Sequence, residues 1–236
     1  MCRRDANRAS SLMAEHIAQG RDAVLDALAG RDFVQFTNGT EVQVRDQLER
    51  VAGAGGRMLS GAIAAYPRHI GRPDTLVLYA GDAGVFERNE QTLADLAGGR
   101  RYTGGDPGPM NAVYVSAFAF YYAALGGFFE AAALARARGV PPREFAAALP
   151  GIAALLLDHV EDAARRIEED DYAGDQATVD IHVTGSSRRL RTFAELGVQS
   201  GMTAAFVDYC RQAADAGDGG EDIAAVFKRI AAPPES

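Results

Sequence analysis

Residues 105–138, with the sequence GDPGPMNAVYVSAFAFYYAALGGFFEAAALARAR, divide this chain into two parts of different character. Pro107 and Pro109 end the first part, and no proline occurs between Met110 and Arg138. The proline-free stretch is dense in Ala, Phe and Tyr, so apolar residues occupy every side of it when it is drawn as a helix. The pattern predicts one long helix that is buried on most sides, either in a core or against a second subunit.

The part before residue 105 alternates helix and strand signals. The predicted elements are a helix over residues 8–29, a strand over 33–36, a helix over 41–52, and strands over 58–63 and 75–79. Asn38-Gly39 supplies the turn between the first strand and the second helix. Strand, helix and strand in this order are typical of a βαβ unit, here the tail end of a doubly wound sheet.

The part after residue 138 contains only helix signals. Helices are predicted over residues 142–169, 176–196, 200–216 and 221–231, and Pro150 is expected to kink or divide the first of them. The sequence therefore predicts an α/β remnant plus an all-α domain. The boundary falls between residues 108 and 109, with a truncated βα remnant over 1–108 and a helical domain over 109–236.

Composition narrows the class of protein. A chain of 236 residues with 47% hydrophobic and 24% charged residues is ordinary for a globular protein. Its net charge of −8 argues against nucleic acid or an anionic membrane as the main partner. We expect no apolar run of the roughly 20 residues that span a bilayer, and no signal peptide follows Met1. The expected location is the cytoplasm.

Dinucleotide-binding folds hold the pyrophosphate at a glycine turn that follows a strand and opens a helix. The chain has four glycine-rich segments, at residues 53–56, 98–99, 104–105 and 217–220. None has the required order and spacing. The sequence therefore predicts that a nucleotide clamp is missing, with a misassigned start or a trimmed chain as the alternative.

Three motifs carry a resemblance to a known family. They are Thr37-Asn38-Gly39-Thr40, the segment GAIAAYPRHIG over residues 61–71, and Gly105-Asp106-Pro107-Gly108. Over about residues 22–231 the chain resembles the imine reductases and reductive aminases, which are related to the β-hydroxyacid dehydrogenases. The resemblance implies a homodimer interlocked through the long helix. It also implies a pocket that holds an imine or iminium beside the nicotinamide of NADPH.

The resemblance assigns roles to residues on the long helix and in the Asn-Gly loop. Tyr114 matches the proton-donating position, Tyr122 matches the second tyrosine of reductive aminases, and Asn38 matches the asparagine beside the substrate. Spacings of three and four residues place Asn111 and Phe118 on the same helical face as both tyrosines. The alternatives are ordinary turn chemistry for Asn38 and simple core packing for the aromatic helix.

Three further residues are candidates for substrate binding. Tyr66 lies where the second strand meets the implied pocket, although a tyrosine at the end of a strand is often a packing residue. Asp180 and His182 fall on a helix that covers the partner's active site in the family, and a histidine can titrate near neutral pH. The other histidines share no metal-ligand spacing, so no metal site is expected.

Lys228 is the only lysine of the chain. The long helix therefore lacks the catalytic lysine that hydroxyacid dehydrogenases are expected to carry there. The proton-handling residues of the implied site are present, whereas the nucleotide clamp is not recognised. The resulting hypothesis is an enzyme of specialised metabolism that needs no cofactor. It would cyclise, isomerise or add to an amine, imine or iminium by proton transfer. The alternatives are an NADPH-dependent imine reductase whose nucleotide-binding part is missing or supplied by another chain, and a non-catalytic dimeric ligand-binding module.

Overall fold

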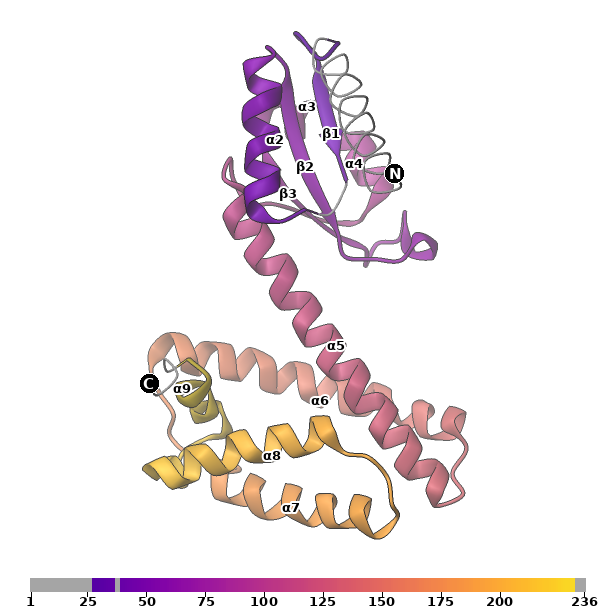
Figure 1. Cartoon of the computed structure of the whole chain (residues 1–236), viewed down its shortest axis with the longest axis vertical. Coiled ribbons are helices and arrows are strands. Elements are labelled where there is room, and N and C mark those ends of the chain that lie inside the picture. The colour runs from indigo at the N-terminus through magenta and orange to yellow at the C-terminus, as the bar shows by residue number, and fades with distance from the viewer. Residues whose placement is uncertain (1–26, 37–38, 232–236) are drawn as a thin grey trace, which may run out of the picture. The chain divides into compact units, whose positions relative to one another are not determined.

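The computed structural model describes residues 27–36 and 39–231 (Figure 1). The chain forms two compact units, Met1–Phe120 and Tyr121–Ser236, and each is described here by itself. Helix α5 (Pro107–Ala137) starts in the first unit and ends in the second. The predicted boundary between residues 108 and 109 falls in the first turn of α5 and stays a proposal.

The first unit is built on a four-stranded sheet with the order β1-β2-β3-β4. Its elements are β1 (Asp32–Gln35), α2 (Glu41–Gly53), β2 (Arg57–Ile63), β3 (Leu76–Gly81), α3 (Ala83–Arg88), α4 (Glu90–Leu96) and β4 (Gly99–Tyr102). Strands β1 and β2 pair in parallel and are connected by α2, which confirms the predicted βαβ unit. Strand β3 is antiparallel to β2 and parallel to β4, so the sheet is mixed.

The sequence analysis missed β4 and the two short helices before it. Strand β4 is four residues long and carries Arg100 and Arg101 in succession, so it lacks the apolar alternation of a buried strand. A short, charged strand is typical of the edge of a sheet, where it discourages pairing with another chain. The predicted helix over residues 8–29 lies mostly outside the described residues, and residues 27–30 form a turn.

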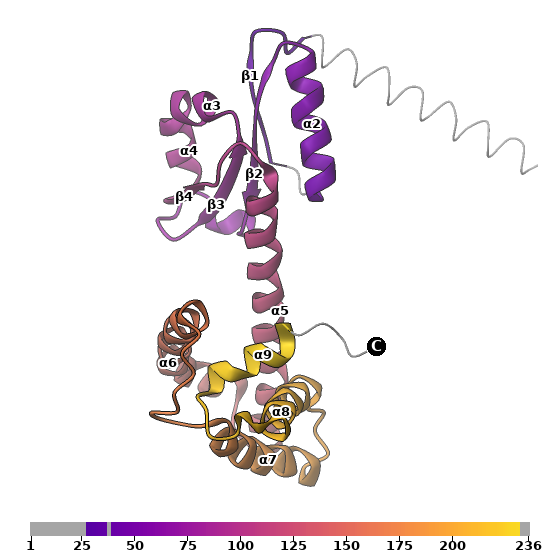
Figure 2. The same ribbon diagram turned by 90° about the vertical axis from the view of Figure 1, so that its left-hand side faces the viewer.

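Both faces of the sheet are covered, with α3 and α4 on one side and α2 on the other (Figure 2). On the α3 and α4 side, Leu59, Val77 and Tyr79 pack against buried residues of the two helices. On the α2 side, Leu78 and Ala80 belong to a cluster whose other members lie on β2, α2 and the first turn of α5. Burial of alternate strand residues on opposite faces follows from the two-residue period of the strand.

The second unit is helical, as predicted. Its elements are the end of α5, then α6 (Pro142–Glu169), α7 (Val179–Glu195), α8 (Gly201–Ala213), a π-helical turn (Ala214–Asp218), a 3₁₀ turn (Ile223–Ala225) and α9 (Val226–Ala231). Pro150 lies inside α6, which continues past it, so the helix is not divided there and the predicted kink stays a prediction. The core of this unit contains Val179, Cys210 and Ala225, none of which is accessible to solvent.

Composition predicted no apolar segment long enough to span a bilayer, and helix α5 contradicts this. By length and composition alone, it is the one helix in the described part of the chain that could cross a bilayer. Several of its large apolar side chains are exposed to solvent, including Val115, Tyr122 and Phe129 at 56%, 63% and 61%. Its Glu130, however, hydrogen-bonds to the first turn of α8, so this part of α5 packs as a helix of a folded domain.

Candidate active site

A small cavity lies in the first unit between α2, β2 and the start of α5. Its volume is about 20 Å³, enough for one water molecule. The residues that line it are Gly39, Val44, Ser60, Gly61, Ala62, Met110, Asn111 and Tyr114. The cavity lies beyond the carboxyl end of β1, which is where open α/β sheets bind ligands.

The loop between β1 and α2 is held from two sides. Thr40 caps α2 by accepting a hydrogen bond from the backbone N–H of Gln43, and the Gln43 side chain accepts one from the Thr40 N–H at 2.9 Å. From α5, Asn111 Nδ2 donates to the carbonyl oxygen of Gly39 at 3.1 Å. The Gly39–Thr40 peptide is therefore hydrogen-bonded to α5, and Asn38 lies outside the described residues.

Tyr114 has a ring that is fixed by packing and a hydroxyl that bonds to no described residue. Its half-buried ring packs against the cluster that contains Val44, Ala62 and Leu78, and lies 4.8 Å from the ring of Phe118. Within residues 27–36 and 39–231, the Tyr114 hydroxyl makes no hydrogen bond. With respect to these residues, the hydroxyl can donate to a ligand while the ring is held in place.

The sequence analysis did not identify the β2 side of this cavity. A Cβ atom added to Gly61 would lie 2.6 Å from the Phe36 ring and 3.1 Å from the Tyr79 ring, so glycine is needed for this packing. A glycine inside a strand commonly marks such a close approach. Gly61, the first residue of the segment 61–71, was therefore the sequence signal that could have identified Ser60, Gly61 and Ala62.

Tyr66 does not line the cavity with Tyr114. It is 56% exposed, and the Arg68 guanidinium lies 5.9 Å from the centre of its ring. His69 Nδ1 accepts a hydrogen bond from the Tyr66 N–H at 3.3 Å. These contacts place Tyr66 in an exposed turn after β2, and its role in substrate binding stays a prediction.

The remaining predicted site residues belong to the second unit. Tyr122 is 63% exposed, and its ring lies 5.4 Å from that of Tyr121. Asp180 is exposed in the first turn of α7. His182 is half-buried and lines a polar cavity of about 360 Å³ that also contains His159 and Asp222. Their roles in binding stay predictions.

The electrostatic setting of His182 favours its neutral form. Burial lowers the pKa of His182, because the charged imidazolium loses hydration. The Asp222 carboxylate opposes this change, whereas His159 and Arg189 add to it. No group of three or more His, Cys, Asp or Glu residues suited to a metal ion occurs among residues 27–36 and 39–231.

The N-termini of α2 and α3 are not open for the pyrophosphate of a dinucleotide. The N-termini of α2 and α3, which follow β1 and β3, are capped by the side chains of Thr40 and Asp82. Gly81, the glycine before α3, has a φ of +123°, and a Cβ there would lie 2.5 Å from the Met58 carbonyl oxygen. Glycine is thus required at position 81 by the backbone conformation and by the close packing against β2.

Known proteins resemble this chain in sequence and in structure. A family model for the NADPH-dependent reductive aminase-like C-terminal domain matches residues 106–232. The NADPH-dependent reductive aminase of Aspergillus oryzae (strain ATCC 42149 / RIB 40) is 28% identical over 211 residues, which are 88% of this chain and 71% of the relative. An imine reductase from Pseudomonas sp. is 35% identical, with a TM-score of 0.82, over 86% of this chain and 70% of that one. A reductive aminase from Aspergillus terreus, solved with NADPH and ethyl levulinate, is 27% identical, with a TM-score of 0.79, over 86% and 70%.

The four-stranded α/β unit, the long helix and the helical unit are the parts of an imine reductase-like fold. The chain belongs to the family of imine reductases and NADPH-dependent reductive aminases. This confirms the resemblance drawn from Asn38-Gly39, the segment 61–71 and the Asp-Pro-Gly turn.

The predicted independence from a cofactor is contradicted. The family model and the Aspergillus oryzae relative are both NADPH-dependent by name, and the Aspergillus terreus enzyme was solved with NADPH. The absence of a recognisable glycine turn does not exclude nucleotide binding, because a nucleotide site is assembled from many segments of a chain. One missing motif therefore does not show that a nucleotide site is lost.

Proposed function

We propose that this chain acts in the NADPH-dependent reduction of imines or iminium ions, including those formed from a carbonyl compound and an amine. The names of its relatives support this reaction class, and NADPH would supply the hydride when bound. The observation that carries the proposal for this chain is Tyr114. Its ring is fixed on α5, while its hydroxyl is unbonded among the described residues beside a cavity at the β1–α2 loop.

Tyr114 handles the proton in this proposal. Its phenol donates a hydrogen bond or a proton to the imine nitrogen and stabilises the charge that develops there. Phe118 supports the Tyr114 ring, and Asn111 holds the loop that follows Asn38. We propose that Asn38 and Tyr122 orient the substrate, and that Tyr66, Asp180 and His182 contribute to its binding.

The proposal is tested by mixing the chain with NADPH and a small cyclic imine and following oxidation of the nicotinamide. We expect Tyr114→Phe to lower kcat by about a hundredfold or more, because it removes the proton donor and keeps the ring. Tyr121→Phe is the matched control, since it removes a hydroxyl from the same helix at a position without a proposed role. It should retain wild-type activity.

Two results would contradict the proposal. One is a Tyr114→Phe variant with the wild-type kcat. The other is conversion of the imine by the wild type without oxidation of NADPH, which would instead support cyclisation or isomerisation by proton transfer. Calorimetric titration with NADPH completes the test, since absence of both binding and turnover would favour a non-catalytic ligand-binding module.

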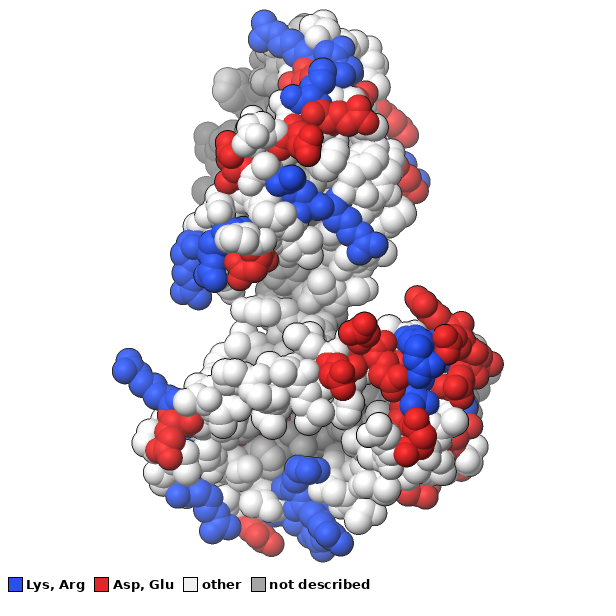
Figure 3. Space-filling view, turned by 180° about the vertical axis from the view of Figure 1, so that it is seen from behind, with Lys and Arg blue, Asp and Glu red and all other residues white. Residues whose placement is uncertain are grey.

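We also propose that the working form is a cytoplasmic homodimer. Helix α6 presents an aliphatic strip to solvent, formed by Ile152, Leu155, Leu156, Leu157 and Val160, each 43–61% exposed. Figure 3 shows a broad uncharged surface on the second unit, beside a group of acidic side chains. Apolar surfaces of this kind usually mark a protein–protein interface. A second copy could cover the α6 strip together with the exposed apolar residues of α5.

A further inference from the structure

Lys228 of α9 carries the only ε-amine of the chain, since every other basic side chain apart from histidine is an arginine. This matters for the proposed function, because lysine amines react with aldehydes and ketones. The neutral amine attacks the carbonyl carbon, a C–N bond forms, and water leaves to give an imine. A hydride donor would then convert that imine to a permanently alkylated lysine.

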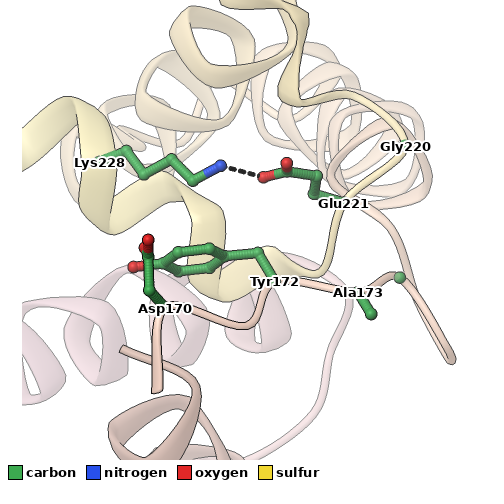
Figure 4. A pocket seen from close by; sticks show the side chains of 7 residues that line it. Asp170, Tyr172, Ala173, Gly220, Glu221 and Lys228 are labelled. Carbon is green, nitrogen blue, oxygen red and sulfur yellow. Dashed lines mark hydrogen bonds and ion pairs between the residues drawn. The ribbon is translucent and has the colours of Figure 1, made fainter. Parts of the chain in front are cut away.

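The Lys228 ammonium is surrounded by groups that stabilise its charge. Its Nζ atom donates a short hydrogen bond to the Glu221 carboxylate and a second to Asp218 Oδ1 at 3.2 Å. Nζ also lies 4.5 Å from the centre of the Tyr172 ring, within the range of a cation–π interaction. Figure 4 shows Lys228 extending toward Glu221 across the pocket that contains Tyr172.

Each of these contacts favours the charged amine over the neutral one. The hydrogen bond to Glu221 is the largest contribution to the raised pKa of Lys228; burial acts in the opposite direction, and Asp218 adds to the increase. The side chain is 27% exposed, so small carbonyl compounds can reach the neighbourhood. Protection must then come from the charge state and the contacts rather than from complete burial.

We propose that Glu221, Asp218 and Tyr172 form a cage that keeps the only ε-amine of the chain unreactive toward aldehydes and ketones. The inference rests on the proposed function, in which carbonyl compounds are substrates in the presence of a hydride donor. Arginine at the other basic positions fits the same requirement, because a guanidinium stays protonated. The chain thus offers little lysine for self-alkylation.

The experiment compares Lys228 with a reference lysine in the same molecule. Arg138 is exposed beyond the end of α5, and its side chain makes no hydrogen bond or ion pair within the described part of the chain. The full-length Arg138→Lys variant is treated with an aliphatic aldehyde and cyanoborohydride, and alkylation at both positions is measured by peptide mass spectrometry. Cyanoborohydride delivers hydride to the imine carbon, and water supplies the proton to nitrogen.

We expect Lys228 to be alkylated severalfold less than the lysine introduced at position 138, because the contacts with Glu221, Asp218 and Tyr172 stabilise its charged form. Glu221→Gln and Asp218→Asn, each combined with Arg138→Lys, should reduce that difference. Equal alkylation at both positions in the Arg138→Lys variant would overturn the proposal, whether or not the cage variants fold. Because the hydride donor is chemical, this outcome is independent of imine reduction by the chain. Failure of the proposed function is therefore seen separately, as absence of NADPH oxidation.

Discussion

At the scale of single residues, Asp32 connects three elements of the first unit. Its carboxylate accepts hydrogen bonds from Arg57 Nε at 2.6 Å and from Arg88 Nε and Nη2 at 2.9 and 3.0 Å. These contacts join the start of β1 to β2 and to α3. The partners are 25 and 56 residues away in the chain, so no local pattern indicates them. Asp32 is therefore a structural residue that only the folded chain reveals.

The first prediction concerns acid stability. Hydrogen bonds from Arg88, and next from Arg57, lower the pKa of Asp32 from 3.8 to about 2. A lowered pKa in the folded state means that the carboxylate stabilises the fold above pH 3.8. This contribution is lost as the pH falls through about 2. Asp32→Asn should lower the melting temperature at neutral pH and weaken its dependence on pH in this acid window.

Asp74→Asn is the control for Asp32, because Asp74 pairs with the nearby Arg72 while 71% exposed. Thermal unfolding of the three proteins, followed by circular dichroism at several pH values, distinguishes them. The same acid dependence in Asp32→Asn and wild type would show that Asp32 is not the group responsible.

At the scale of elements, helix α8 depends on a side chain from α5. Its N-cap residue, Ser200, makes no side-chain capping hydrogen bond. Glu130 of α5 accepts hydrogen bonds from the backbone N–H groups of Met202 at 2.7 Å and Thr203 at 3.1 Å, and from the Thr203 hydroxyl at 3.0 Å. A carboxylate at this position satisfies free N–H groups and interacts favourably with the helix dipole. The cap is supplied across 72 residues of sequence.

We predict that Glu130→Ala lowers the free energy of unfolding by about 1 kcal/mol, the usual effect of losing an N-terminal cap. Hydrogen exchange should increase first at the N-terminal turn of α8. Burial raises the pKa of Glu130, but the hydrogen bonds from Met202 and Thr203 outweigh it, so the net pKa is lowered. The stabilisation should therefore be present above the ordinary glutamate pKa and be lost as the pH falls from there through the lower pKa of the folded state.

Glu161→Ala, at an exposed position of α6, should change neither the stability nor the exchange of α8. If both alanine variants lose the same stability, the effect is not specific to the cap. If Glu130→Ala leaves exchange at residues 201–204 unchanged, Ser200 and solvent suffice at this helix end.

At the scale of the whole molecule, the described chain leaves much apolar surface without a partner. The exposed residues lie mainly on α5, α6 and α8, and a folded monomer rarely presents large contiguous apolar patches to water. The α6 strip is the clearest case, because five large aliphatic residues occur within nine positions of one helix. Closed dimers are the commonest way for identical chains to bury such surfaces.

We predict that the wild type elutes as a dimer, twice its mass of 25.0 kDa, in size-exclusion chromatography with light scattering. Leu157→Glu should shift the equilibrium to the monomer, since a charge would be buried in the interface. Val42→Glu is the matched control because Val42 is a 77% exposed apolar residue of α2 in the first unit and is not part of the α6 strip. A monomeric wild type, or a dimer that Leu157→Glu does not weaken, would contradict the assignment.

The helical period predicted which residues of α5 lie together, while their catalytic and binding roles stay predictions. Tyr114 and Asn111 line the cavity together, and Phe118 packs against Tyr114, because the periodicity of one helix determines which of its residues share a face. Tyr66 lies elsewhere in the first unit, since the direction of the chain after β2 depends on packing that no local motif records. The expected absence of a cofactor was wrong because it inferred a property of the whole site from one motif.

By itself, the sequence determined the type of most elements, the βαβ unit, the long helix α5 and the family, because these depend on local periodicity and short motifs. The tertiary structure alone decided the antiparallel direction of β3, the contact of Asn111 with Gly39, and the use of Glu130 as a cap for α8. Each of these joins segments that are distant in the sequence. Their meeting depends on the path of the folded chain, which local propensities do not specify.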